Sequence, residues 1–143
     1  MKPRRILFLA LVACACASYA GGRAEWTSYP KEGIVYKFEV HAGEKDRWDS
    51  AKRDAPPLAP GKAARLAKKF AATIPLSEDM KGWTVEEITL TRLSPGPQEE
   101  WVYVVHFNAV PKPDVFNGPV PWIDVPVRMD GTVPRALVER KKS

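Results

Sequence analysis

One segment with a helical period lies between segments with a two-residue period, and this order restricts the fold more than any other feature. Residues 62–74 carry apolar side chains at spacings of three or four, which predicts a helix with one apolar stripe. Pro60 suits the first turn of this helix, and Pro75 prevents its continuation. The stripe consists of Ala63, Leu66, Ala67, Phe70 and Ile74.

Segments that alternate between apolar and polar side chains predict strands on both sides of this helix. One strand, at residues 33–41, precedes the helix. Three more follow it at 83–93, 100–110 and 122–129, and the chain then returns in a short strand at 133–138. Strands that follow one another through short connections favour antiparallel pairing.

Local composition refines the places of these strands and loops. Val102 and Val104 add apolar side chains to the second face of their strand, which predicts a central position. Pro126 cannot donate a ladder hydrogen bond, so its strand is predicted to lie at an edge or to carry a bulge. The Ser-Pro-Gly-Pro sequence at 94–97 predicts a tight turn. The crowded charges and prolines of residues 42–61 predict an exposed excursion.

These patterns predict an α+β fold, in which one amphipathic helix packs on a curved antiparallel sheet of four to five strands. The expected order is strand, helix, strand, strand, strand. The expected organisation is a signal peptide (1–20), an N-terminal tether (21–32), a single domain (33–138) and a disordered tail (139–143).

The first twenty residues have the layout of a secretory signal peptide. Three basic side chains precede an apolar run at 6–17, and Ser18 and Ala20 place small residues at the −3 and −1 positions of a cleavage site. The run is too short to span a membrane as a helix, so the sequence predicts export. Removal of residues 1–20 leaves 19 Lys and Arg against 17 Asp and Glu. This near-neutral balance argues against nucleic-acid binding.

Both cysteines, Cys14 and Cys16, lie within this segment. Cleavage after Ala20 would leave a periplasmic or secreted chain without cysteine, stabilised by core packing and not by disulfides. The sequence Leu-Val-Ala-Cys at 11–14 is instead similar to a bacterial lipobox, in which Cys14 would be lipidated and become the new N-terminus of a membrane-anchored lipoprotein. The sequence leaves both interpretations open.

The layout of residues 57–134 resembles that of bacterial exported domains of PepSY-like type and, more loosely, the cystatin-like fold. The segment 57–64 leads into the helix, Trp83 opens a strand, 101–105 form the next, and Asp-Gly-Thr-Val at 130–133 is similar to a closing turn. The resemblance implies a non-enzymatic binding or inhibitory role, often with exported proteases as partners. It transfers no inhibitory residue, because 94–98 reads Ser-Pro-Gly-Pro-Gln where cystatins carry Gln-Val-Gly.

The residues that could carry catalysis or bind a metal are few. His41 and His106 are the two histidines and lie on different predicted strands. If those strands were adjacent, Glu39 could complete a metal site. Two isolated histidines on strand faces are more commonly ordinary surface groups, so the sequence predicts no metal and no cofactor. No serine has a nucleophile-elbow setting, and adjacent carboxylates on a strand point to opposite faces. The chain is therefore predicted not to be an enzyme.

Exposed apolar and cationic side chains remain as candidates for contact with partners. We interpret most of the five tryptophans as core residues, and the four cations of the helix (Lys62, Arg65, Lys68, Lys69) as a solvated face. Candidate partner contacts are Val115 and Phe116, in a proline-restrained connection, and Trp122.

The sequence thus predicts a small exported, non-catalytic domain that binds another envelope protein or peptide, with a membrane contact only through a lipid on Cys14. A structural envelope lipoprotein is the alternative, and a small hydrolase-type enzyme is the weakest of the three. The sequence indicates no particular oligomeric state.

Overall fold

The computed structural model describes residues 22–94, 99–114 and 118–142. In chain order the elements are β1 (Arg23–Lys31), β2 (Ile34–His41), the 3₁₀ helix η1 (Glu44–Asp46), α1 (Pro60–Ala71), β3 (Met80–Arg92), β4 (Trp101–Pro111), β5 (Trp122–Arg128) and β6 (Ala136–Arg140). The strands form one sheet in the order β3-β4-β5-β1-β2-β6, with every neighbouring pair antiparallel. The predicted α+β class, with one helix on an antiparallel sheet, is confirmed.

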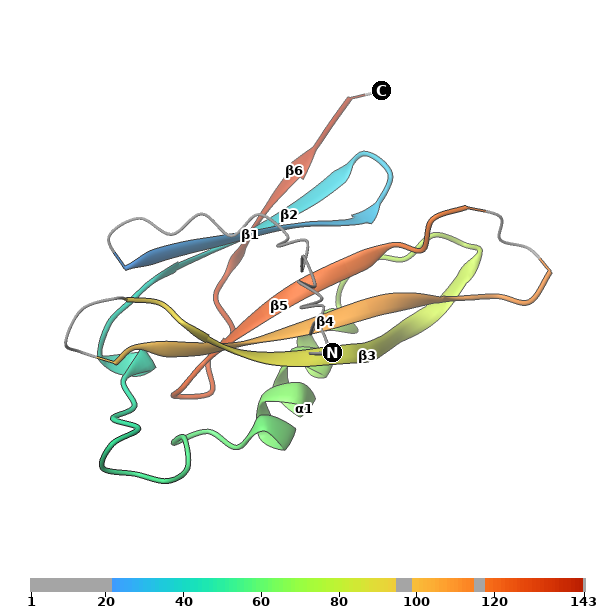
Figure 1. The fold of residues 1–143 in the computed structure, drawn as a ribbon. Coiled ribbons are helices and arrows are strands. Elements are labelled where there is room, and N and C mark those ends of the chain that lie inside the picture. Colours follow the sequence, from blue (N-terminus) through green and yellow to red (C-terminus); the bar gives the residue numbers. More distant parts are fainter. Residues whose placement is uncertain (1–21, 95–98, 115–117, 143) are drawn as a thin grey trace, which may run out of the picture.

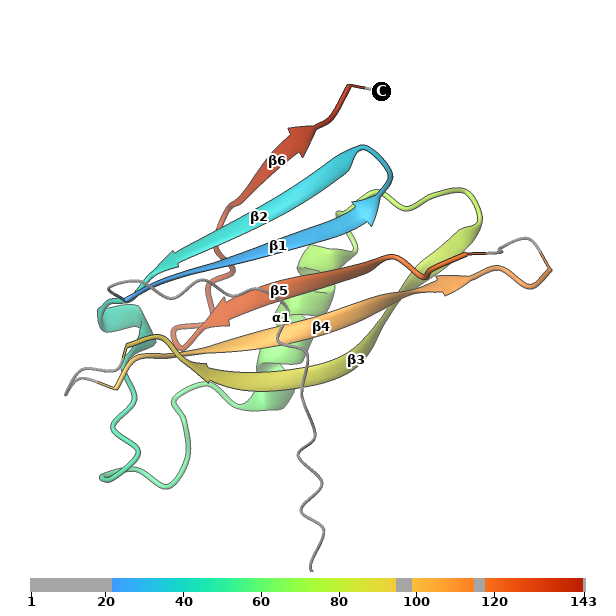
Figure 2. The same cartoon turned by 45° about the horizontal axis from the view of Figure 1, so that its top comes forward.

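The sheet consists of two three-stranded halves, which Figure 1 shows nearly edge-on. β3, β4 and β5 form one half, and β1, β2 and β6 form the other. The halves meet at β1 and β5, which pair in register at Tyr29 and Trp122. Away from this pair β1 and β5 diverge, as Figure 2 shows after a 45° turn. The sheet remains open, with β3 and β6 as its outer strands.

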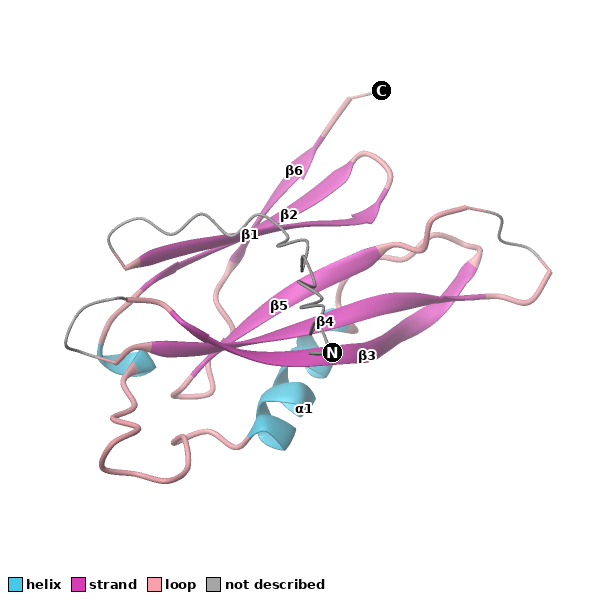
Figure 3. Ribbon diagram, in the orientation of Figure 1, coloured by secondary structure: helices cyan, strands magenta, loops and turns pink. Residues whose placement is uncertain are grey.

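α1 begins where the sequence predicted. Pro60 occupies the first turn after Ala59, and three alanines on one face (Ala63, Ala67, Ala71) are fully buried. This face packs against β3, β4 and β5, so the helix covers one side of that half of the sheet (Figure 3). The helix ends at Ala71, three residues before its expected end, but Ile74 remains buried in the turn that follows.

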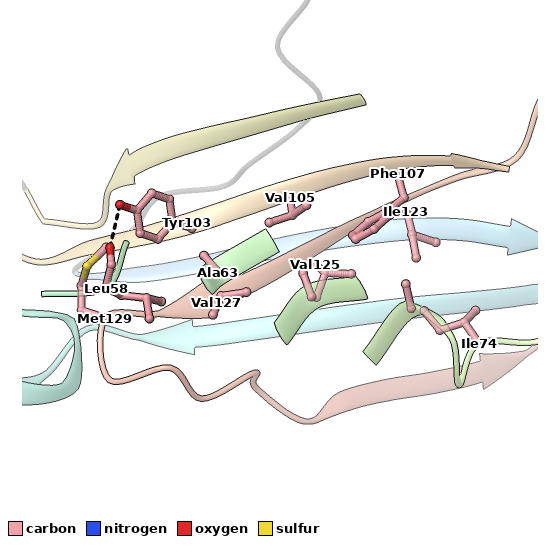
Figure 4. Packing of buried hydrophobic residues seen from close by; sticks show 12 residues of the cluster. Leu58, Ala63, Ile74, Tyr103, Val105, Phe107, Ile123, Val125, Val127 and Met129 are labelled. Carbon is pink, nitrogen blue, oxygen red and sulfur yellow. Dashed lines mark hydrogen bonds between the residues drawn. The ribbon is translucent and has the colours of Figure 1, made fainter. Parts of the chain in front are cut away.

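Two adjoining apolar clusters make the core. The first joins α1 to one face of β4 and β5 (Figure 4), with Val105, Phe107 and Val125 fully buried. The second combines residues of β1 and β2 with Val102 and Val104 from the other face of β4. β4 is therefore buried on both faces between β3 and β5, which confirms its predicted central position.

The predicted N-terminal tether at 21–32 is wrong for its described part, because β1 occupies residues 23–31. β1 pairs with β2 along most of its length and buries Ala24, Trp26 and Ser28 on one face. The alternation is visible in the sequence, but Ser28 and Pro30 take inward positions where larger apolar side chains are expected. The described residues therefore form six strands, where four to five were predicted.

The prediction that Pro126 marks an edge or a bulge is also wrong, because β5 lies inside the sheet. The backbone N–H of Asp124 donates to the Ser28 hydroxyl (2.9 Å), and that of Arg128 donates to the carbonyl of Thr132 (2.9 Å). Neither acceptor belongs to β4. Since alternate residues of a strand direct their N–H groups to the same side, the Pro126 nitrogen also faces away from β4. The proline therefore leaves the β4–β5 ladder intact. On the other side β1 has already diverged from β5, so the missing N–H is not needed there either.

The last strand lies slightly later than predicted. β6 spans 136–140 and pairs with β2, with Val138 opposite Tyr36. The expected disordered tail at 139–143 is therefore wrong for residues 139 and 140. Lys37 of β2 donates a hydrogen bond to Glu139 (2.8 Å), which helps to hold this end of the chain on the sheet.

Candidate functional site

β3 offers the longest outer edge of the sheet. It has 13 residues, pairs with β4 on one side, and in the described part of the chain pairs with no strand on the other. Its register with β4 shifts between Val85 and Glu87. The residues beyond this irregularity, 87–92, pair continuously with β4 and therefore form a regular ladder.

The direction of the amide groups along β3 follows from one hydrogen bond. Leu93 donates its backbone N–H to the carbonyl of Glu100 (2.7 Å), across the ladder toward β4. Because N–H groups alternate between the two sides of an antiparallel strand, Thr89 and Thr91 also direct their N–H groups at β4. Ile88 and Leu90 direct theirs at the open edge.

The side chains along this edge are unusually exposed for a strand next to a buried one. Val85 is 38% exposed and Ile88 is 37% exposed. Both lie on the face of the sheet that α1 covers nearer the middle of the sheet. The acidic pair Glu86 and Glu87 is also exposed. Sequence reasoning identified this strand but not its edge position. The available signal was the adjacent acidic pair Glu86 and Glu87, since long outer strands commonly carry charges and irregularities.

A second cluster lies where the two halves of the sheet join. Tyr29 and Trp122 are cross-strand neighbours with their rings at 72° and centroids 6.4 Å apart. The Trp122 ring also contacts the His106 ring, at 5.6 Å. His106 Nδ1 lies 2.6 Å from Asp124 Oδ1, and the side chains are 30% and 11% exposed. Trp122, a predicted contact residue, thus lies between an exposed tyrosine and a paired histidine.

The chemistry available to this cluster is limited to orienting the imidazole. A carboxylate oxygen accepts hydrogen bonds, so His106 donates from Nδ1 to Asp124 Oδ1, and this bond fixes the orientation of the imidazole ring. Ser28 is not a nucleophile for this pair, because it is fully buried and its hydroxyl accepts the backbone N–H of Asp124. The cluster therefore lacks the relay of a serine hydrolase.

The two histidines do not meet. β2, which carries His41, and β4, which carries His106, are separated in the sheet by β1 and β5. His41 instead contacts Glu39 on its own strand. No group of three or more metal-ligating side chains gathers within the described ranges.

Asp46 and Arg128 form an ion pair that the sequence did not predict. Asp46 is fully buried and accepts hydrogen bonds from Arg128 Nε (2.9 Å) and Nη2 (2.5 Å). Arg128 also donates to the carbonyl of His41 (3.0 Å). The hydrogen bond to Asp46 raises the pKa of Arg128. Asp46 lies among crowded charges that are typical of a solvated loop. Its burial depends on Arg128, which lies 82 residues away in the sequence. We assign this pair a structural role.

Cationic side chains gather at α1 and at one cleft. Lys62, Arg65, Lys68 and Lys69 are exposed, and α1 carries no acidic residue. The cleft lies between the β1–β2 turn, the chain beyond α1 and the end of β6. It is lined by Lys31, Glu32, Pro75, Arg140, Lys141 and Lys142, among others. Within the part of the chain that the structure describes, none of the eight cations of these two groups has an ion-pair partner.

Several predicted sites lie outside the described residues. These are Val115 and Phe116, the signal segment with Cys14, and most of the predicted turn at 94–97. Of the predicted contact residues, the structure places Trp122 alone.

Comparisons with protein-family models, with curated proteins and with solved structures found no match. The resemblance to PepSY-like and cystatin-like domains therefore stays a prediction. None of the helices in the described ranges is long and apolar enough to cross a membrane.

Proposed function

We propose that this chain is an exported, non-catalytic domain that binds another envelope protein or peptide by adding a strand to the outer edge of β3. One observation carries the proposal: β3 presents a long edge without a pairing strand among the described residues. Main-chain hydrogen bonds to such an edge supply affinity, and the alternating side chains of the added strand supply specificity.

The regular part of the edge, residues 87–92, is the favoured docking segment. Ile88 and Leu90 direct backbone groups outward, so that a partner strand can continue the ladder. Ile88 also exposes apolar surface that the added strand would cover. Glu86 precedes this segment and Glu87 is its first residue, and both are exposed, so the partner is expected to combine apolar residues with a basic one.

The export part of the proposal rests on the sequence of residues 1–20. A lipoprotein anchored through Cys14 would place the same edge at a membrane surface, and a chain that begins at Gly21 would be released. Mass spectrometry of the mature N-terminus distinguishes these forms: a diacylated Cys14 indicates the anchor, and an unmodified Gly21 indicates release.

An edge-blocking variant tests the binding mode. Ile88→Pro removes an N–H group that points outward and spares the ladder to β4. Ile88→Ala is the matched control, because it removes the same apolar side chain but keeps the N–H. Both variants are first compared with the original chain by thermal unfolding.

Affinity capture from the envelope fraction, followed by titration with the purified captured protein, gives the readout. We expect the original chain and Ile88→Ala to bind that protein, and Ile88→Pro to bind it at least tenfold more weakly. Hydrogen exchange on the complex should show new protection at Ile88 and Leu90. A folded Ile88→Pro variant that binds the captured protein as well as Ile88→Ala does would refute strand addition.

A further inference from the structure

We propose that the cationic face of α1 is a contact surface for a bilayer that contains anionic phospholipid. Its four cations (Lys62, Arg65, Lys68, Lys69) fall within about one third of the helix circumference. The three buried alanines lie on the opposite side of the helix. Apolar packing on the sheet therefore fixes this face outward, and α1 would lie on a membrane without inserting into it.

The charge of this face is not neutralised within the described protein. α1 carries no acidic residue, and none of the four cations has an ion-pair partner among the described residues. Some cations on other exposed segments do have carboxylate neighbours: Lys52 lies 3.2 Å from Asp49, and Lys45 lies 3.9 Å from Asp130. An anionic surface supplies the counter-charge that the helix lacks.

The cationic cleft extends the charge at the C-terminal end of α1. Thr73 and Ile74 donate backbone hydrogen bonds to Phe70 and Ala71, which hold the chain that leads to Pro75 against the helix end. Pro75 in turn lines the cleft. The cleft cations are Lys31, Arg140, Lys141 and Lys142. They lie far from α1 in the sequence, so the sequence alone does not show that they are close to the cationic face of the helix.

Charge complementarity and the sequence before β1 favour a bilayer over a soluble polyanion. In the lipoprotein alternative, a lipid on Cys14 enters a membrane. β1 begins at Arg23, and the residues between Cys14 and Arg23 span at most about 32 Å. A lipidated chain would thus hold the domain near a bilayer. Each Lys or Arg near an anionic surface strengthens membrane association about fivefold, so several cations suffice for a reversible contact.

Lysine footprinting on the full chain tests this surface, whatever the state of residues 1–20. The chain is incubated with vesicles of phosphatidylcholine alone, or of phosphatidylcholine with 30% phosphatidylglycerol, and treated with an amine-reactive ester. Mass spectrometry then measures labelling at each lysine. We expect labelling of Lys62, Lys68 and Lys69 to fall severalfold on the anionic vesicles and to recover at high salt. Labelling of Lys45 and Lys52 should be equal on both.

Matched variants establish that the helix itself makes the contact. Arg65→Gln with Lys69→Gln should abolish most of the protection at Lys62 and Lys68. Lys45→Gln with Lys52→Gln, which removes the same charge elsewhere, should preserve it. Equal labelling of the helix lysines on both vesicles would overturn the proposal. Protection by soluble polyphosphate but not by anionic vesicles would also overturn it, in favour of a soluble polyanion.

Discussion

The buried pair of Asp46 and Arg128 makes a quantitative prediction about stability. Asp46→Ala removes both acceptor oxygens from the Arg128 guanidinium, whose side chain is 20% exposed. It also removes the acceptor for the Gly43 N–H (3.2 Å). Arg128 would keep its hydrogen bond to the carbonyl of His41. The substitution therefore leaves a largely buried cation without its counter-ion.

Removing one partner of a buried ion pair typically destabilises a protein by about 3–5 kcal/mol, because the remaining charge is left uncompensated. We expect Asp46→Ala to reduce the free energy of unfolding by about 3 kcal/mol, at the lower end because solvent reaches part of Arg128. Replacing both partners, by Asp46→Leu and Arg128→Met, should cost less than the single substitution, since no unpaired charge remains.

Urea denaturation followed by tryptophan fluorescence measures these differences. Glu44→Ala is a suitable control, because Glu44 is an exposed residue of η1 whose side chain is 89% exposed. This variant should unfold close to the original midpoint. A loss below about 1 kcal/mol for Asp46→Ala would refute the reasoning, as would a double variant that is less stable than the single one.

Three further predictions concern the core and one turn. Burial raises the pKa of Tyr103, whose neutral hydroxyl donates to the carbonyl of Leu58 (2.9 Å). The contribution of Tyr103 to the free energy of unfolding is therefore complete below about pH 10 and is lost as the pH rises through the folded-state pKa. Tyr103→Phe should cost about 1 kcal/mol at neutral pH and flatten the alkaline decline in urea-derived stability; an unchanged decline would contradict this. Gly131→Ala should cost about 1–2 kcal/mol, because Gly131 has φ +88°, whereas Gly82→Ala, with open space around it, should not; equal melting temperatures would contradict the assignment. Ile123→Ala should cost about 2–5 kcal/mol in the same denaturation assay, since Ile123 is fully buried in the first cluster, and a neutral result would place it outside the core.

The segments with strong periodicity were predictable from the sequence. α1 and the central position of β4 follow from local apolar patterns, because burial on one or both faces requires those patterns. β1 escaped prediction because Ser28 and Pro30 occupy inward positions and because the preceding glycines suggested a tether. Its partner β2 and its neighbour β5 supply the burial that its own composition does not indicate.

Features that depend on distant segments were not predictable. Pro126 was predicted to mark an edge or a bulge because it lacks an N–H. That loss matters only if a strand pairs on that side, and the divergence of β1 from β5 removes the requirement. Asp46 was assigned to a solvated loop because nothing near it in the sequence identifies Arg128 as its partner. The open edge of β3 likewise follows from the sheet order, which joins β5 to β1, a strand that comes more than 90 residues earlier.

The most direct test of the account is the exchange of individual β3 amides in the free protein, measured by NMR in deuterium oxide. An open edge that can accept a strand requires alternating protection along this strand. We predict slow exchange for the amides of Thr89 and Thr91, which point at β4, and fast exchange for those of Ile88 and Leu90, which point outward. Uniformly slow exchange across these four residues would show that the edge is already covered, and would contradict strand addition as the function of this domain.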